Sequence, residues 1–103
     1  MSNVPIDAYV LDTLMRDLVA HDRSASSFLV YVHLYRRSFG AAKDAVRVSH
    51  QRLADATGLS KSAVQAAVRN LTRRRLVRVS KASATAIPEY AVLRPWRRDG
   101  AGG

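Results

Sequence analysis

Residues 61–74 carry the side chains best suited to chemistry, because hydrogen-bond donors recur there at helical spacing. On the expected helix, the face pointing away from the core holds donor-rich or small side chains: Lys61, Ser62, Gln65, Ala66 and Arg69. A helix of this kind is slim enough to enter the major groove of DNA, which is about 12 Å wide. This face is therefore a candidate surface for hydrogen bonding to DNA.

Other kinds of chemistry have little support in the sequence. The chain has no Cys, so it can form neither a disulfide framework nor a thiolate centre. His21, His33 and His50 lie too far apart for a recognisable metal motif, and no nucleophile–base set or phosphate-cradling glycine loop is visible. We expect a protein that is not an enzyme and that needs neither a metal nor a cofactor.

Signals for export and for membrane insertion are also missing from the sequence. Residues 1–5 show no basic start followed by an apolar block, and charged residues interrupt every apolar stretch before it reaches membrane-spanning length. We expect a cytoplasmic protein that is associated with the nucleoid and not with a membrane.

Charge is distributed unevenly along the 103 residues, whose formal net charge is +9. Residues 1–22 carry four Asp against Arg16 alone, a net charge of −3, whereas residues 23–103 carry 16 Lys or Arg against four acidic residues, a net charge of +12. Such asymmetry is typical of a basic body that binds a polyanion, here behind an acidic N-terminal helix.

Hydrophobic periodicity predicts two helices in the first part of the chain. Apolar residues recur at three- and four-residue spacing over 5–20, and Ser24 is the expected N-cap of a second helix that stops at Gly40. The second helix is apolar over most of its circumference, so it needs a cover on more than one side. One cover is the domain core, and the other is the first helix or a second subunit.

Two further helices are expected to meet through a short turn. Ser49 is the N-cap candidate of a helix over 50–57, which ends at Gly58 because the turn needs a residue that tolerates a positive φ. Ser60 is then the expected N-cap of the helix over 61–74.

Short strands flank this helical pair. A β-like stretch is expected over 46–48, and alternating polar and apolar residues predict strands over 76–81 and 87–93. Pro88, near the start of the last strand, indicates an edge position in the sheet.

One set of residues has the spacing of a known DNA-binding fold. It consists of Leu53-Ala54, Gly58-Leu59-Ser60, Val64, Val68, Leu71 and Leu76-Val77, followed by the expected hairpin. With this pattern, residues 46–93 resemble the winged helix-turn-helix family, seen in MarR-type and GntR-type regulators and in phage replication protein O-type initiator domains. Arg75 stands where the family usually has Gly between the recognition helix and the first wing strand, so we expect the helix to end differently here.

The resemblance implies an α+β fold that is mainly α, with a small β-hairpin wing: a winged helix-turn-helix with an extra N-terminal helix. The expected organisation is an N-terminal helix over 1–22 that is a candidate dimerisation element, a winged domain over 23–96 and a flexible tail over 97–103.

The resemblance also implies which residues contact DNA. The helix over 61–74 becomes the recognition helix, with Gln65 and Arg69 at base edges, since Gln can pair with adenine and Arg with guanine. The expected contacts from its N-terminus, to bases or to phosphates, come from Ser60, Lys61 and Ser62. Further phosphate contacts are expected from Ser49, His50, Gln51 and Arg73, and wing contacts from Lys81, Ser83 and Thr85.

We therefore expect a sequence-specific double-stranded DNA-binding protein, a transcriptional regulator that acts as a homodimer. Two alternatives stay open: a replication-initiation or partition factor of a phage or plasmid with the same fold, and a winged-helix module that binds protein. A small-molecule effector held at a hydrophobic dimer interface also stays open.

Three further features are interpreted as structural. At most two of the Arg residues over 73–75 share a helical face, and one is expected to complement the helix dipole. The Asp residues that recur every five positions from Asp7 to Asp22 do not fall on one face of an α-helix, so we expect them to be solvated. Trp96 is expected to anchor the end of the chain on the domain.

Overall fold

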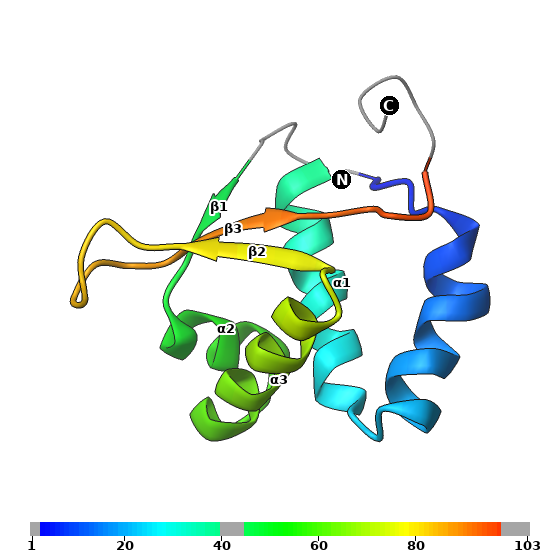
Figure 1. Cartoon of the computed structure of the whole chain (residues 1–103), viewed down its shortest axis with the longest axis horizontal. Coiled ribbons are helices and arrows are strands. Elements are labelled where there is room, and N and C mark those ends of the chain that lie inside the picture. The colour runs from blue at the N-terminus through cyan, green and yellow to red at the C-terminus, as the bar shows by residue number, and fades with distance from the viewer. Residues whose placement is uncertain (1–2, 40–44, 98–103) are drawn as a thin grey trace.

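The computed structural model describes residues 3–39 and 45–97, which fold as a mixed α+β structure (Figure 1). In the view of Figure 1, helices occupy the centre, the right and the lower left, a small sheet crosses above them, and a hairpin projects to the left. The N-terminal helix stands at the opposite end of the view from the tip of this hairpin.

The N-terminal helix covers residues 8–21 and includes two π-helical turns, η1 (Val10–Leu14) and η2 (Asp17–His21). A π turn joins residues five apart, as in the 2.9 Å hydrogen bond from the Asp22 N–H to the Asp17 carbonyl. This helix packs on the core through the buried side chains of Val10, Leu14 and Leu18.

The central helix is α1 (Ala25–Phe39), and Ser24 caps it as predicted, since its hydroxyl accepts a 3.2 Å hydrogen bond from the Ser27 N–H. Its buried side chains include Tyr31 and Tyr35, and it packs against the N-terminal helix, α2, α3 and β3. The N-terminal helix thus supplies one of the two covers expected for α1. The predicted stop at Gly40 lies outside the described residues.

The predicted helical pair is α2 (His50–Thr57) and α3 (Lys61–Arg73). Ser49 accepts a 3.1 Å hydrogen bond from the Arg52 N–H, Ser60 accepts one of the same length from the Ala63 N–H, and Gly58 has a φ of 80°. Both N-caps and the glycine end of α2 are therefore confirmed.

The end of α3 corrects the expectation for Arg75. This residue takes the left-handed conformation itself, with a φ of 58°. The Leu76 N–H then bonds the Leu71 carbonyl at 2.9 Å, and the Arg75 N–H bonds the Thr72 carbonyl at 3.0 Å. This is the Schellman pattern that glycine commonly completes, held in place by the two buried leucines. The helix ends as it would with glycine, at the cost of an unfavourable φ.

In the described part of the chain, the strands β1 (Val46–Arg47), β2 (Val77–Ser80) and β3 (Glu89–Val92) form an antiparallel sheet in the order β1-β3-β2. The expectation that Pro88 marks an edge strand is therefore wrong, because β3 lies in the middle. Pro88 precedes the strand, where its missing N–H interrupts no ladder bond, and its carbonyl accepts a 3.2 Å hydrogen bond from the Val48 N–H.

Residues after β3 return to the N-terminal helix, and Trp96 anchors them as predicted. Its ring stacks on Tyr9 with 4.8 Å between ring centroids, and its Nε1–H donates to the Asp7 carboxylate at 2.9 Å. Arg97 also lies 3.7 Å from this carboxylate, while the rest of the predicted tail, 98–103, lies outside the described residues.

None of the helices within residues 3–39 and 45–97 combines the length and the apolar character that crossing a membrane requires.

Candidate nucleic-acid interface

A groove of about 460 Å³ separates the outer side of α3 from the β2–β3 hairpin. Its apolar lining comes from Val68, Val79 and Pro88, of which Val68 and Pro88 are buried. Its polar lining comes from His50, Arg69, Thr72, Arg73 and Lys81. We call this feature the helix–hairpin groove. It joins α2, α3 and the hairpin, which lie far apart in the sequence.

The helix–hairpin groove brings together basic residues that the sequence singled out separately. Arg69, Arg73 and Lys81 are exposed, and His50 is half-buried. The groove also contains Thr72, which the sequence pattern did not single out as a contact residue. Thr72 could have been found, because it follows Arg69 by three residues and Val68 by four on the same helix.

The N-terminal half of α3 carries the other side chains of the helix face that is predicted to contact DNA. Lys61, Ser62 and Ala66 are exposed, and Gln65 is half-buried. The Ser60 and Ser62 hydroxyls lie 3.2 Å apart, and Ser60 is already occupied in capping α3. Ser62 and Gln65 are therefore the more available hydrogen-bonding side chains at this end.

Two of the predicted phosphate contacts have their side chains engaged within α2. Ser49 caps the helix, and Gln51 donates a 3.0 Å hydrogen bond from Nε2 to the Asp55 carboxylate one turn later. Both residues are accessible, but a ligand must compete with an existing hydrogen bond at each.

The hairpin tip holds the predicted wing residues. The Lys81 ammonium donates to the Ala84 carbonyl at 3.2 Å, and the hydroxyls of Ser83 and Thr85 lie 3.5 Å apart. All three side chains are exposed, and the tip projects beyond the body of the molecule (Figure 1).

The basic surroundings of the groove act on His50. Burial and the positive charges of Lys81 and Lys61 lower the pKa of His50 below its ordinary value of 6.5. His50 is therefore neutral at physiological pH, although it lies at a site rich in cations. An anion placed in the groove would reverse the charge effect and raise this pKa.

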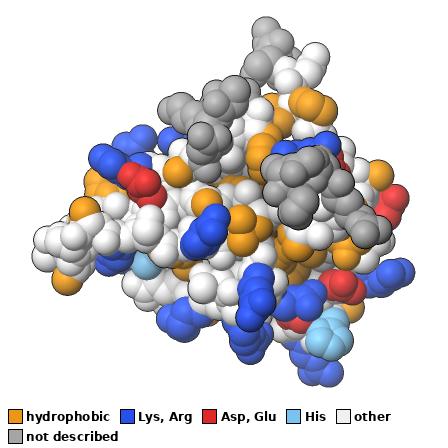
Figure 2. Space-filling view, turned by 45° about the horizontal axis from the view of Figure 1, so that its top comes forward, with side chains coloured by type: hydrophobic (Ala, Val, Ile, Leu, Met, Phe, Trp, Pro, Cys, Tyr) orange, Lys and Arg blue, Asp and Glu red, His pale blue; other side chains and the backbone are white. Residues whose placement is uncertain are grey.

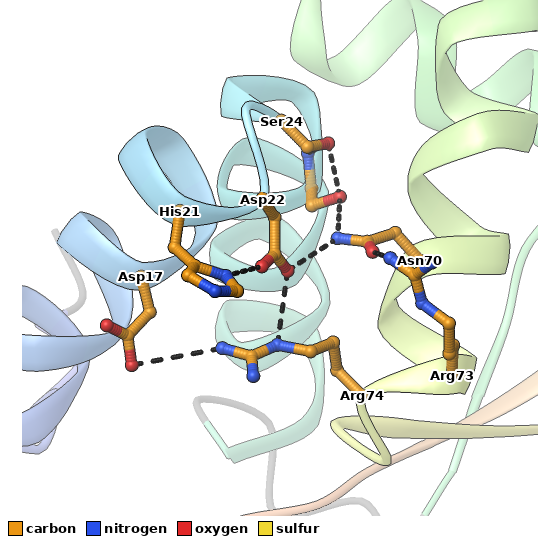
Figure 3. A network of polar contacts seen from close by, with 8 residues as sticks. Asp17, His21, Asp22, Ser24, Asn70, Arg73 and Arg74 are labelled. Atoms are coloured by element: carbon orange, nitrogen blue, oxygen red, sulfur yellow. Dashed lines mark hydrogen bonds and ion pairs between the residues drawn. The ribbon is translucent and has the colours of Figure 1, made fainter.

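A network of polar contacts holds the far side of α3 against the N-terminal helix (Figure 3). Its centre is Asp22, whose side chain is only 4% exposed. The Asn70 amide donates to Asp22 at 3.1 Å and to the Ser27 hydroxyl at 3.0 Å, while Arg74 Nε lies 3.1 Å from the Asp22 carboxylate. Arg73 donates to the amide oxygen of Asn70. The network thus reaches from the N-terminal helix to a residue of the groove.

This network corrects the expectation that the regularly spaced Asp residues are only solvated. Asp17 and Asp22 both face Arg74, at 3.8 Å and 3.1 Å. They share a face because the π turn η2 joins residues five apart, whereas the expectation assumed an α-helix. Arg74 is accordingly an ion-pair partner, not only a helix-end charge.

Burial raises the pKa of Asp22, but the hydrogen bonds from His21 and Asn70, together with the charge of Arg74, outweigh it. The pKa of Asp22 therefore lies below its ordinary value of 3.8, and this carboxylate is charged in the folded protein near neutral pH.

In the view of Figure 2, Lys and Arg side chains gather along the lower edge, with Asp or Glu side chains among them towards its right end. Among the described residues, no three His, Asp or Glu side chains gather in a way that could hold a metal ion.

Comparison with protein-family models, with curated proteins and with solved structures finds no significant match to this chain.

Proposed function

We propose that this chain is a sequence-specific double-stranded DNA-binding protein of the winged helix-turn-helix type, acting as a transcriptional regulator. The observation that carries the proposal is the helix–hairpin groove. Predicted DNA-contacting residues from α2, α3 and the hairpin line it together: His50, Arg69, Arg73 and Lys81.

The shape of this groove suits one strand of a DNA backbone. If α3 lies in the major groove and the hairpin reaches the neighbouring minor groove, the strand between those grooves must pass between α3 and the hairpin. Val68, Val79 and Pro88 would then face deoxyribose, while the surrounding cations face phosphates. Burial of sugar against apolar groups and of phosphate against cations matches the chemistry of a nucleotide chain.

In this arrangement, the N-terminal half of α3 points at the base edges. Ser62 and Gln65 can both donate and accept hydrogen bonds, and Gln can pair in bidentate fashion with adenine. Lys61 adds a positive charge next to the α3 N-terminus, where the helix dipole also favours phosphate. Arg69 lies between the base-contacting half of α3 and the helix–hairpin groove, because it is a predicted base-edge contact and also lines the groove.

The proposal is tested by removing two cations of the groove and measuring binding to duplex DNA as a function of salt. In the double variant Arg73→Ala/Lys81→Ala, we expect weaker binding to every duplex. The slope of log K against log salt should become shallower by about 2, since each phosphate contact contributes about 0.9.

Arg78→Ala is the matched control, because Arg78 is an exposed arginine on β2 that does not line the groove. It should leave the slope almost unchanged. If the double variant and the control behave alike, or if the wild-type chain does not bind duplex DNA, the proposed function is wrong. Binding of a protein by this surface would then be the next hypothesis.

A further inference from the structure

An apolar stripe is exposed along the N-terminal helix. Leu11, Met15 and Val19 are 47%, 38% and 42% exposed, and each lies next in sequence to a core residue of the same helix. A spacing of four falls between the 3.6 residues of an α turn and the wider π turns present here, so the stripe runs nearly parallel to the helix axis. A single exposed apolar residue needs no explanation, but a continuous row indicates an interaction surface.

We propose that two copies of the chain associate through this stripe, with their N-terminal helices antiparallel about a two-fold axis at Met15. In that register, Leu11 of one copy lies opposite Val19 of the other, and the two Met15 side chains meet. Such an interface is self-complementary, as a two-fold dimer requires.

The charges beside the stripe favour this partner and this direction. Asp12 and Arg16 are exposed and follow Leu11 and Met15 directly, so they line one flank of the stripe. A two-fold axis perpendicular to the helices keeps this flank on the same side in both copies. Asp12 of one copy and Arg16 of the other then differ by two residues along the axis, or about 3 Å at 1.5 Å per residue. The same pair forms a second time by symmetry.

A parallel pairing would not form these ion pairs. It would place the Asp12–Arg16 flank against the opposite flank of the other copy, which carries the core-facing residues Val10, Leu14 and Leu18. The charge pattern is therefore specific for the antiparallel arrangement.

The distribution of charge over the whole chain also favours this end of the molecule. Two copies with a net charge of +9 each repel one another, but residues 1–22 carry a net charge of −3. Repulsion between copies is therefore weakest where the N-terminal helices meet. This helix also lies at the opposite end of the view from the hairpin tip, so pairing leaves the helix–hairpin groove open (Figure 1).

Sedimentation equilibrium of the full chain across the micromolar range tests the proposal. We expect the wild-type mass to rise with concentration from 11.4 kDa towards twice that value. Asp12→Arg and Arg16→Asp each place like charges opposite one another twice, so each should weaken association by about tenfold or more. The double variant Asp12→Arg/Arg16→Asp restores both pairs with reversed signs and should associate like the wild type.

Substitutions at these exposed positions leave the core intact, and thermal unfolding followed by circular dichroism checks the fold of each variant. A wild-type chain that stays at 11.4 kDa contradicts the proposal. Single variants that associate as well as the wild type would also contradict it, because the interface would then lie elsewhere. A double variant that does not regain wild-type association would exclude this register. Self-association does not depend on the proposed function: a monomer that still binds DNA specifically would refute this inference alone.

Discussion

At the scale of residues, base reading and phosphate binding should separate between the two halves of α3. Gln65 belongs to the N-terminal half, while Arg73 lines the helix–hairpin groove and is oriented by Asn70. A base contact contributes to discrimination between sequences, whereas a phosphate contact contributes equally to all of them.

Gln65→Ala should reduce the binding free energy for the preferred duplex by about 1–3 kcal/mol and leave that for unrelated DNA almost unchanged. Arg73→Ala should weaken binding to both duplexes alike, with a salt slope shallower by about 1. Fluorescence anisotropy with the two duplexes at several salt concentrations separates the effects. A uniform loss in Gln65→Ala would remove this residue from base readout.

DNA binding should depend on pH through His50. The pKa of His50 lies below 6.5 in the free protein, and a phosphate beside it would raise that pKa, so binding takes up a proton. Affinity should therefore increase as the pH falls from neutrality through about 6.5. His50→Gln should remove this dependence, and His21→Gln, at an exposed histidine outside the groove, serves as the control. Equal pH profiles for wild type and His50→Gln would contradict the placement of phosphate at His50.

At the scale of elements, the end of α3 carries a strain that a single substitution can release. Arg75 adopts a φ of 58°, which glycine tolerates freely. Arg75→Gly should raise the free energy of unfolding by about 0.5–1 kcal/mol, the relief of strain being partly offset by the entropy of glycine in the unfolded chain. Arg73→Gly, inside the helix, should instead lower it by about 1 kcal/mol. Urea denaturation distinguishes the two, and a destabilised Arg75→Gly variant would contradict the described helix end.

The polar network between the N-terminal helix and α3 should make stability sensitive to acid. The pKa of Asp22 is lower in the folded protein than in the unfolded chain, so the unfolded chain binds more protons in acid. The stability contributed by the Asp22 carboxylate is fully present above its pKa in the unfolded chain, about 3.9. It is lost as the pH falls through the lower pKa of Asp22 in the folded protein.

Asp22→Asn should therefore lower stability near neutral pH and lose less stability than the wild type on acidification below about pH 4. Asp12→Asn, at an exposed aspartate of the N-terminal helix, is the matched control, measured at concentrations at which the chain is a monomer. Urea denaturation of the three proteins at a series of pH values measures the effect. Parallel curves for Asp22→Asn and the wild type would show that the network adds no pH-dependent stability.

The local elements could be predicted from the sequence because their signals lie within a few residues. Ser49, Gly58 and Ser60 bracket α2 and α3, and each acts through hydrogen bonds or dihedral angles of its own segment. The contact between Asp22 and Asn70 could not be predicted, since 48 positions separate them. The order of the strands also depends on tertiary packing, and the spacing of side chains contains no signal for it.

At the scale of the whole molecule, acidic and basic regions are separated. The N-terminal helix, with its excess of Asp, stands opposite the hairpin tip, and α3 lies between them (Figure 1). A charge distribution of this kind would orient the protein as it approaches a polyanion, with the helix–hairpin groove towards DNA. His50, Arg69, Arg73 and Lys81 could be singled out one at a time from the sequence, but their meeting in a single groove required the fold.

The most direct measurement of the central claim is selection of bound duplexes from a random DNA pool at about 150 mM salt, where phosphate contacts alone give weak binding. We predict enrichment of a defined motif, arranged as an inverted repeat if two chains bind as the antiparallel pair. A pool that stays random after repeated selection would contradict sequence-specific DNA binding by this chain.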